Sequence, residues 1–483
     1  MRLIDLIKDI PVRDIIGDTA LEVRGITKDS RMVGDGYVFF ATAASEPYIK
    51  DAFIRGASVI VSDKRHDYGF RCHIITDNIG SVLGRMASRF YGSPSEKISV
   101  TGITGTNGKT TITYLIESIL NYAGMSPGVI GTISYRYKGN TFKAENTTPG
   151  ADELQMLLSE MVAHGVSHVI MEVSSHALDQ KRVEGTQFNN AIFTNLTHDH
   201  LDYHKNLDNY KEAKRLLFHH YLRESNKKER YAILNMDDPF VDEFIPEPPI
   251  RTLFYSLKKQ TDVHLIDYME DIHGLRLRIV LGKEEIDIAS PLIGGFNASN
   301  ILAACLYGYI EGISSKDIKK GIEALEGVPG RLERVRNNKG YSIFVDYAHT
   351  PDALAKVLGM LNRLKKGRLI TVFGCGGNRD EAKRPLMGDI ATRLSDYVII
   401  TSDNPRNEEP EKIIEDIIKG VHGNSYRVIE NRRDAIFEAI RMLEEDDCLL
   451  IAGKGHEDYQ IIGSNIYHFN DREIAEGFLH VVS

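Results

Sequence analysis

The sequence Ile-Ser-Val-Thr-Gly-Ile-Thr-Gly-Thr-Asn-Gly-Lys-Thr-Thr-Ile-Thr occupies residues 98–113 and decides how the middle of this chain folds. Its alternating apolar residues from Ile98 to Ile103 predict a strand, and a helical pattern runs from about Lys109 to Tyr122. A strand, a glycine loop and a helix in this order turn several backbone N–H groups and a helix N-terminus toward one anion. The segment therefore predicts a site for the phosphates of a nucleoside triphosphate.

Two side chains of this loop have expected roles in nucleotide binding. The Lys109 ammonium is expected to reach the outer phosphates, and the Thr110 hydroxyl to hold a magnesium ion. The strict G-x-x-x-x-G-K-[ST] pattern fails by one place, because Ile103 stands where the first glycine belongs and Gly102 lies beside it. The residues predicted to bind ATP in this loop are Gly105, Thr106, Asn107, Gly108, Lys109, Thr110 and Thr111.

The composition is that of an ordinary globular protein. At 483 residues the chain is too long for one core, so about three domains are expected. A net charge of −9 and the lack of a basic tract argue against binding to nucleic acid or to a membrane surface. The four cysteines have no C-x-x-C spacing, which favours reduced thiols. We expect a cytoplasmic monomer whose substrates are small molecules.

Two clusters of small residues divide the chain into three predicted domains. These clusters lie at residues 91–95 and 327–330. Between them, apolar strands alternate with amphipathic helices, which is typical of a mostly parallel sheet covered by helices. The predicted fold class is α/β with a small N-terminal domain at 1–95, a central phosphate-loop domain at 96–327 and a Rossmann-like C-terminal domain at 328–483.

In the last third of the chain, four apolar strands each lead into a polar or glycine-rich cluster. Ligands of an open parallel sheet bind at the carboxyl ends of its strands, so these clusters are expected to meet at one edge. Residues 343–345 lead into 346–349, residues 369–373 into 374–380, residues 398–400 into 403–406, and residues 448–451 into 453–457.

Glu172 ends a buried apolar run and is a candidate metal ligand. A carboxylate at the end of a strand beside a phosphate loop is placed to bind a nucleotide-bound magnesium ion. The alternative is a structural ion pair between Glu172 and a lysine.

Residues 197–204 contain three histidines and two aspartates, which also suits zinc. Because no cysteine or H-E-x-x-H pattern supports zinc, a magnesium site that uses one histidine is favoured. Surface or hydrogen-bonding roles are expected for His198 and His204. Residues 210–218 form an amphipathic helical pattern, in which the residues alone would leave Lys214 on a solvated face.

Six ordered motifs make essentially the whole chain resemble the Mur ligases, ATP-dependent enzymes that add amino acids to the UDP-sugar peptide precursor of peptidoglycan. Within that family it looks most like the branch that extends UDP-N-acetylmuramoyl-L-alanyl-D-glutamate in the cytoplasm through an acyl-phosphate. The resemblance implies ATP and Mg²⁺ as cofactors. The motifs lie at residues 105–111, 172–178, 195–204, 295–300, 346–351 and 453–457.

The tetrapeptide Asp-Asn-Pro-Arg at residues 403–406 resembles the signature of the relatives that add meso-diaminopimelate. A guanidinium such as that of Arg406 holds a distal carboxylate by two parallel hydrogen bonds, whereas lysine has no carboxylate there. A surface ion pair of Arg406 with Glu408 or Glu409 is the structural alternative. The functional alternatives are the same reaction with L-lysine, another amide ligase of the fold such as a folylpolyglutamate synthase, and a nucleotide-dependent switch.

The resemblance also assigns residues to each ligand. It departs at residues 43–48, which replace the Asp-Gly-His-rich stretch that lies near the uridine diphosphate in the family fold. For the UDP-sugar peptide it implies Ser30, Arg31, Thr147, Thr148, Ser174, Gln180 and Arg182, and for the rest of the ATP site Asn297, Asn300, Arg331, Asp346 and His349. For the amino acid it implies Arg379, Asp403, Asn404, Pro405, Arg406, Gly453 and Glu457. The implied catalytic residues are Lys109, Glu172, His200 and Lys214, and the metal ligands are Thr110, Glu172, His200 and a carbamylated Lys214.

Overall fold

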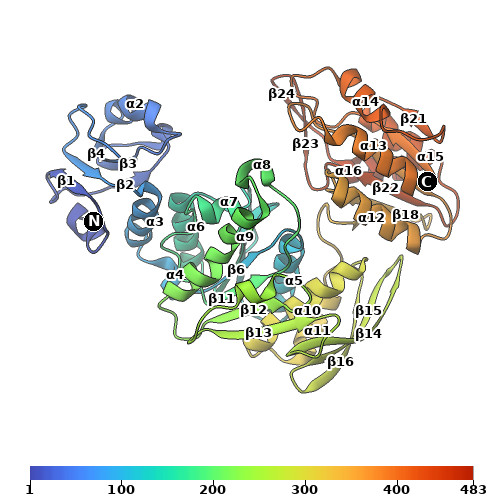
Figure 1. The fold of residues 1–483 in the computed structure, drawn as a ribbon, viewed down its shortest axis with the longest axis horizontal. Coiled ribbons are helices and arrows are strands. Elements are labelled where there is room, and N and C mark those ends of the chain that lie inside the picture. Colours follow the sequence, from blue (N-terminus) through green and yellow to red (C-terminus); the bar gives the residue numbers. More distant parts are fainter. Residues whose placement is uncertain (482–483) are drawn as a thin grey trace. The chain divides into compact units, whose positions relative to one another are not determined.

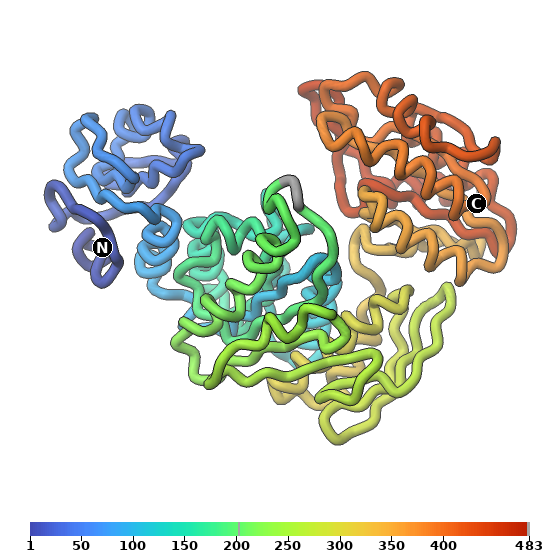
Figure 2. Tube along the Cα trace, viewed as in Figure 1, coloured from blue at the N-terminus to red at the C-terminus, as the bar shows by residue number. Residues whose placement is uncertain are grey.

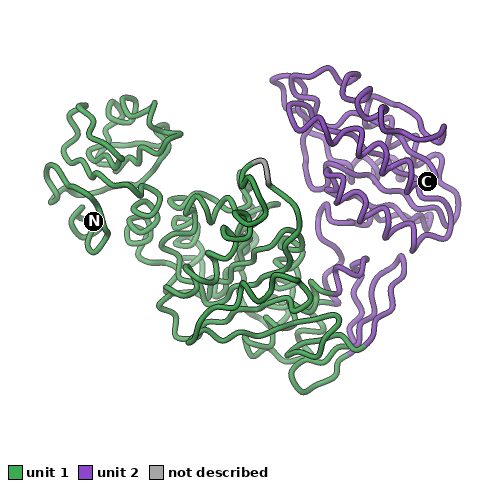
Figure 3. Tube along the Cα trace, in the orientation of Figure 1, with its two compact units in different colours: residues 1–266, 279–286, 299–322 green, residues 267–278, 287–298, 323–483 purple. Residues whose placement is uncertain are grey.

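The computed structural model describes residues 1–481, apart from the side chains of Leu201, Asp202 and Val481. Figures 1 and 2 follow the chain from its N-terminus in blue to its C-terminus in red. Internal contacts divide it into two compact units, which Figure 3 colours separately. The first unit comprises residues 1–266, 279–286 and 299–322, and the second comprises 267–278, 287–298 and 323–483. No helix in the described part of the chain has the length and apolar character needed to cross a membrane.

A five-stranded sheet begins the first unit, in the order β1-β5-β4-β3-β2. Alternate residues of its strands, such as Val59 and Val61, pack against Val82 and Met86 of a covering helix. The strands are β1 Asp14–Gly17, β2 Gly25–Thr27, β3 Tyr37–Phe40, β4 Ala57–Ser62 and β5 Cys72–Ile75, and the helices are α1 Leu3–Ile7, α2 Ile49–Ile54 and α3 Ile79–Phe90.

An eleven-stranded sheet follows, in the order β16-β15-β14-β13-β12-β11-β6-β10-β7-β8-β9. Strand β6 (Ser99–Thr104) lies at its centre and runs parallel to both neighbours, as the sequence pattern at 98–103 predicts. The other strands are β7 Pro127–Ile130, β8 Ser134–Tyr137, β9 Asn140–Lys143, β10 His168–Glu172, β11 Asn190–Phe193, β12 Tyr231–Asn235, β13 Arg251–Ser256, β14 Val263–Asp271, β15 Gly274–Leu281 and β16 Glu284–Ser290.

Helix α5 spans Lys109–Tyr122 and begins directly after the glycine loop, which confirms the predicted strand–loop–helix unit. Its buried side chains include Ile112, Leu115 and Ile119, at the spacing that the sequence pattern shows. The remaining helices of this region are α4 Pro94–Lys97, α6 Ala151–Ala163, α7 Ser175–Asp179, α8 Leu201–His204, α9 Leu207–Leu216, a π-helix at Leu217–Leu222, α10 Gly295–Ile310 and α11 Ser315–Glu323.

A six-stranded sheet forms the second unit, in the order β17-β18-β22-β19-β20-β21. Its strands β18, β22, β19 and β20 are parallel neighbours, so the four polar clusters that follow them meet at one edge as predicted. The strands are β17 Glu333–Arg334, β18 Ser342–Asp346, β19 Leu369–Phe373, β20 Tyr397–Ile400, β21 Tyr426–Val428 and β22 Cys448–Ala452, with a separate hairpin of β23 Tyr459–Ile462 and β24 Asn465–His468.

Both faces of this sheet are buried. Along β19, Leu369 and Phe373 belong to one core, whereas Ile370 and Val372 belong to another on the opposite face. This two-sided burial explains the continuous apolar runs of the strands and confirms the α/β fold class. The covering helices are α12 Pro351–Leu364, α13 Lys383–Leu394, α14 Pro410–Ile418, α15 Arg432–Arg441 and α16 Asp471–Val481.

Each of the three large sheets lies within one of the three predicted domain ranges, but internal contacts divide the chain into two compact units and not three. Residues 1–95 belong to the same unit as most of the central range. Ser81 and Arg85 of α3 donate hydrogen bonds of 3.0 and 2.8 Å to the buried carboxylate of Glu184, which follows α7. The boundaries at 95 and 327 stay predictions.

A buried ion pair joins the last two helices of the chain to the sheet. Arg432, at the start of α15, donates to both carboxylate oxygens of Asp471, at the start of α16, and neither side chain is exposed. Arg432 Nη2 also donates to the carbonyl of Ala452 at the end of β22. The pair therefore fixes the edge of the sheet from which the next loop departs.

We expect Arg432→Met to lower the free energy of unfolding by about 3–5 kcal/mol, because it leaves the Asp471 carboxylate buried without its cation. Urea unfolding followed by circular dichroism measures the change. The control Arg427→Met breaks the exposed pair with Glu438 and should cost less than about 1 kcal/mol. Equal effects of the two substitutions would show that burial of the first pair does not matter.

Candidate active site

The phosphate loop between β6 and α5 is held in shape by the segment that follows β11. Asn195 Oδ1 accepts a hydrogen bond of 3.0 Å from the backbone N–H of Asn107, and the Asn195 carbonyl accepts one of 2.8 Å from that of Thr106. The Thr106 hydroxyl donates in turn to the Thr197 carbonyl. Sequence reasoning assigned Asn195 no role, although it lies within the 195–204 motif.

Two glycines allow this loop to approach its neighbours closely. Gly105 has a φ of +144°, and a Cβ on it would lie 1.9 Å from the hydroxyl of Thr194. Gly108 has a φ of +90°, and a Cβ on it would lie 2.4 Å from Asn300 Oδ1. Any other residue at either position would therefore displace the loop. The same closeness places Asn300 of α10 beside the phosphate loop.

Glu172, at the end of β10, presents a buried carboxylate to the start of α5. The Thr110 hydroxyl donates to Glu172 Oε2 at 3.0 Å. Thr132 donates through its hydroxyl to Oε2 at 3.0 Å and through its backbone N–H to Oε1 at 2.9 Å. The bonds come from threonines rather than from the lysine that the structural alternative required. Thr132 was missed because it becomes a neighbour only when β7 pairs with β10.

Lys214 of α9 is 1% exposed, so the solvated position that its helical pattern alone indicated is wrong. Its Nζ donates to the Gly105 carbonyl at 2.9 Å and lies 4.4 Å from the centre of the Tyr210 ring. Lys109 Nζ donates to the same carbonyl at 2.8 Å. Burial, reinforced by the charge of Lys109, lowers the pKa of Lys214 well below its usual value.

His200 lies in the loop before α8 and has a left-handed backbone with a φ of +54°. Its ring meets that of His176 edge to face at 4.9 Å between centroids. Partial burial lowers the pKa of His200, against the opposing charge of Asp199. His204 is buried and shares a hydrogen bond of 3.0 Å with the Ser175 hydroxyl, the kind of role expected for it.

The candidate metal ligands do not form a preassembled cluster. Among the residues whose side chains are described, no group of three or more His, Cys, Asp and Glu is placed to hold an ion. The Thr110 hydroxyl and the Glu172 carboxylate are both oxygen donors, and they lie in contact.

Five of the residues implied for the UDP-sugar peptide form one bonded cluster next to Glu172. The Thr148 hydroxyl donates to the Glu172 carbonyl at 2.8 Å and accepts from the Ser174 N–H at 3.1 Å. Arg182 donates to the Thr148 carbonyl at 3.0 Å and to Gln180 Oε1 at 2.7 Å. Thr147 shares a hydrogen bond of 3.1 Å with the Thr132 hydroxyl.

The two residues implied near the uridine lie in the five-stranded part of the first unit. Arg31 is exposed and pairs with Asp29, whereas Ser30 is buried. In the loop at 43–48, whose sequence differs from the family pattern, the Ser45 hydroxyl donates to the Phe40 carbonyl and Glu46 forms an ion pair with Lys64.

The other residues implied for ATP lie in the second unit, where Asp346 is the last residue of β18. The buried Asp346 carboxylate accepts from the Leu332 N–H at 2.7 Å and the Ala348 N–H at 2.8 Å, and burial raises its pKa. The Arg331 guanidinium lies 4.9 Å from the centre of the Tyr347 ring. His349 Nδ1 bonds to the Tyr347 carbonyl, and Asn297, on α10, donates to the Ile293 carbonyl at 2.7 Å.

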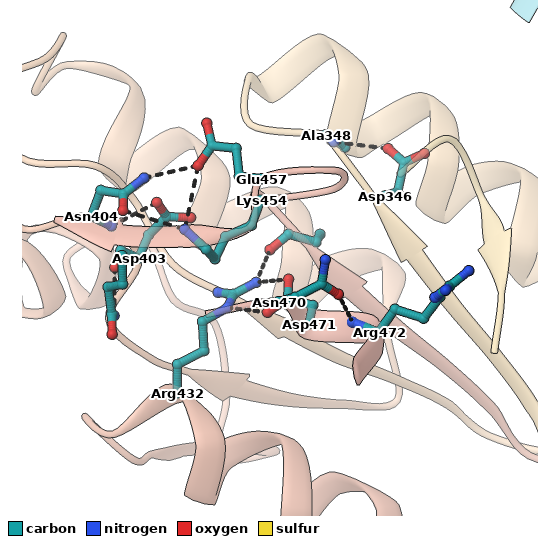
Figure 4. Close-up of polar contacts among 12 residues, drawn as sticks. Asp346, Ala348, Asp403, Asn404, Arg432, Lys454, Glu457, Asn470, Asp471 and Arg472 are labelled. Carbon is teal, nitrogen blue, oxygen red and sulfur yellow. Dashed lines mark hydrogen bonds and ion pairs between the residues drawn. The ribbon is translucent and has the colours of Figure 1, made fainter. Parts of the chain in front are cut away.

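Side chains from two loops, those that follow β20 and β22, meet at the edge of the sheet in the second unit (Figure 4). Asn404 Nδ2 donates to Glu457 Oε2 at 2.9 Å, and the fully buried Lys454 ammonium lies 3.3 Å from both Glu457 Oε2 and Asn404 Oδ1. A Cβ on Gly453 would lie 2.9 Å from Asp403 Oδ2. Burial raises the pKa of Glu457, while Lys454 opposes the rise. Sequence reasoning gave Lys454 no role.

Arg379 and Arg406 lie in the loops that follow β19 and β20. A Cβ on Gly376 would lie 2.9 Å from Arg406 Nη1 and 3.8 Å from Arg379 Cγ, so both arginines approach one point. Arg406 Nη1 donates to the Gly377 carbonyl at 2.9 Å. Glu408 pairs with the buried Arg384 at 2.8 Å, and so is not the partner of Arg406 that the structural alternative proposed.

Comparison with known proteins identifies the family to which this chain belongs. Residues 103–308 match the Mur ligase middle domain, and residues 330–455 match the Mur ligase glutamate ligase domain. The chain is 40% identical over 479 residues to a protein of Bacillus cereus, with 98% of this chain and 97% of the relative covered. The chain belongs to the Mur ligase family.

Two similar relatives and one solved structure share the same name. The Bacillus cereus protein is a UDP-N-acetylmuramoyl-L-alanyl-D-glutamate–2,6-diaminopimelate ligase. A Clostridium tetani protein of the same name is 42% identical over 488 residues, covering 99% of both chains. A solved structure of a ligase with this name matches with a TM-score of 0.73 and 30% identity, covering 100% of this chain and 99% of that one.

His456 gives the second unit a pH-dependent stability. Its Nδ1 is buried without a hydrogen-bond partner among the described residues, and its ring lies 5.1 Å from that of Tyr347. Burial, with the nearby charge of Arg331, lowers the pKa of His456 from 6.5 to about 4. The unfolded chain therefore takes up a proton between these two pH values that the folded chain does not.

We expect this histidine alone to reduce the free energy of unfolding by up to about 3 kcal/mol as the pH falls from 6.5 to 4. Urea unfolding of the wild type and of His456→Gln at both pH values measures it as the difference between the two proteins. His468→Gln is the control with opposite sign, because Glu473 raises the pKa of His468 and that contribution is lost as pH rises. The same pH slope in wild type and His456→Gln would contradict the expectation.

Proposed function

We propose that this chain is an ATP-dependent ligase that joins meso-diaminopimelate to the D-glutamyl carboxylate of UDP-N-acetylmuramoyl-L-alanyl-D-glutamate. The observation that carries the proposal is that Arg406 and Glu457 lie in the loops after β20 and β22, two strands that both pair with β19. The hydrogen bond between Asn404 and Glu457 joins the two loops. We call Asn404, Arg406, Lys454 and Glu457 the acceptor pocket. Diaminopimelate has an ammonium and a carboxylate at its distal end, and the pocket offers one partner to each. The names of the full-length relatives support the same substrates.

In the first half-reaction, the phosphate loop binds ATP so that its γ-phosphoryl group passes to the D-glutamyl carboxylate. Lys109 and the N–H groups at the start of α5 face the phosphates and offset the charge that develops during transfer. The bonded cluster around Thr148 and Arg182 holds the dipeptide end beside Glu172. The products are an acyl-phosphate and ADP.

Magnesium fits the oxygen donors beside the loop. Thr110 and Glu172 would hold the ion, because a hydroxyl and a carboxylate in contact are ligands that magnesium prefers. When bound, the ion neutralises part of the phosphate charge. Thr132, with two hydrogen bonds to the Glu172 carboxylate, keeps that group oriented toward Thr110.

In the second half-reaction, the free amine of diaminopimelate attacks the acyl carbon, an amide forms, and inorganic phosphate leaves. Arg406 holds the distal carboxylate and Glu457 the distal ammonium, so the reacting amine is the one at the other end. The phosphate loop and the acceptor pocket belong to different compact units. Turnover therefore requires the two units to bring their bound substrates together.

Lys214 has the surroundings expected of a lysine that reacts with carbon dioxide. Its ammonium and that of Lys109 share the Gly105 carbonyl, and this repulsion together with burial favours the neutral amine. A neutral amine adds carbon dioxide to give a carbamate, which replaces a buried cation with an anion beside Lys109. We propose that the carbamate completes the metal site with His200.

The deciding measurement is phosphate release from ATP in the presence of UDP-N-acetylmuramoyl-L-alanyl-D-glutamate. We expect rapid release with meso-diaminopimelate and at least about tenfold less with L-lysine, because a lost bidentate ion pair costs 1.4 kcal/mol or more. Faster release with lysine would keep the ligase mechanism and reject the role of Arg406. Release that needs no amine would instead indicate a nucleotide hydrolase or switch.

Lys214→Ala should lose at least about 100-fold in turnover, and a short carboxylate such as acetate should restore part of it by occupying the place of the carbamate. The control Lys211→Ala removes a partly buried lysine of the same helix that pairs with Glu243, and should keep activity without acetate. Full activity of Lys214→Ala in bicarbonate-free buffer would contradict the carbamate proposal.

A further inference from the structure

The hairpin β23–β24 follows the Gly453–Glu457 loop and is bonded to the Asp403–Arg406 loop. Gln460 Nε2 donates to the Asp403 carbonyl at 2.7 Å, and the Ile461 N–H donates to Asn404 Oδ1 at 2.9 Å. The Arg406 N–H donates to the Ile461 carbonyl at 3.1 Å. The Gly463 N–H donates to the Arg406 carbonyl at 2.7 Å. Four hydrogen bonds thus connect the hairpin to the backbone and side chains of the acceptor pocket.

These bonds hold a backbone that the loop would not adopt by itself. Arg406 has a φ of +54°, in the left-handed region that costs a residue with a Cβ about 1 kcal/mol or more. Its N–H and its carbonyl are both bonded to the hairpin, which forms an isolated parallel bridge between Arg406 and Ile462. The direction of the Arg406 guanidinium therefore depends on the hairpin.

The hairpin contributes little to the core. Exposure is 45% for Ile462, 70% for Ile466 and 51% for Tyr467, and β24 is exposed along its whole length. A hairpin with so little buried surface stabilises the fold only weakly. Its best-defined contacts among the described residues are those with the acceptor pocket.

We propose that the β23–β24 hairpin positions the acceptor pocket and that Gln460 is its positioning residue. Gln460 acts by fixing the Asp403 carbonyl, and through it the loop that carries Asn404 and Arg406. This inference rests on the proposed function, since it concerns how the same pocket recognises the distal end of diaminopimelate. According to this inference, Gln460 contributes to the affinity for diaminopimelate without contacting it.

Two substitutions test the role of Gln460. Gln460→Met keeps the side-chain length and has no donor, and Gln460→Glu keeps the shape and, when ionised, cannot donate to the Asp403 carbonyl. We expect each to raise the KM for diaminopimelate about three- to tenfold, the effect of one lost hydrogen bond. The kcat, the KM for ATP and the thermal midpoint should stay within about twofold or 2 °C of the wild type.

Gln187→Met is the matched control. Gln187 accepts a hydrogen bond of 2.7 Å from the Asn226 N–H in the first unit, so this substitution also removes a side-chain bond to the backbone. It should leave the KM for diaminopimelate unchanged.

The outcomes separate the two proposals. If the wild type releases phosphate without any amine, the proposed function fails. If the wild type requires diaminopimelate and both Gln460 variants keep its KM, the function stands and the positioning role is rejected. Losses in kcat, in the KM for ATP and in thermal stability together would show a structural role only, and would also reject it.

Discussion

The buried carboxylate of Glu172 is the constraint on which the rest of the first unit's site depends. Its side chain is held by Thr110 and Thr132, and its carbonyl accepts a hydrogen bond from Thr148. One residue therefore connects the start of α5, where ATP phosphates are expected, with the cluster proposed to hold the dipeptide. A carboxylate taken out of water is tolerated only when its oxygens are bonded, as they are here. A change at the start of α5 therefore also affects the dipeptide cluster, and a change in that cluster affects the start of α5.

The second unit also holds charged groups away from water, and these groups carry charges of both signs. Lys454 is fully buried, and its ammonium lies between Asn404 and Glu457. Because Asn404 Oδ1 accepts from Lys454 and from the Ile461 N–H, its amide nitrogen must face Glu457. The buried cation thus orients the amide and opposes the rise in the pKa of Glu457 that burial causes.

Local patterns were enough to predict the elements, but contacts between distant segments were not. The unit formed by β6, the glycine loop and α5 is visible in consecutive residues, and so is the order of apolar strands and polar clusters in the last third. Thr132 and Gln460 carried no such signal, because their partners lie 40 and 57 residues away. Lys454 lies within the predicted cluster at 453–457, but its partner Asn404 is 50 residues away. The burial of Lys214 was hidden for a related reason. The spacing of residues along a helix shows which side chains share a face. It does not show that a second face of the helix is also buried by the rest of the protein.

The acceptor pocket also shows why one residue type cannot decide specificity by itself. A lysine substrate would satisfy Glu457 as well as diaminopimelate does, so the carboxylate cannot discriminate between them. Discrimination between lysine and diaminopimelate must come from the free energy lost when the Arg406 guanidinium has no carboxylate partner. That loss arises only if Arg406 cannot turn toward water. Its left-handed backbone is bonded at both N–H and carbonyl to the hairpin, which limits that freedom. If Arg406 binds the distal carboxylate as proposed, the rigidity of this loop, and not the charge of the arginine alone, makes that carboxylate a requirement.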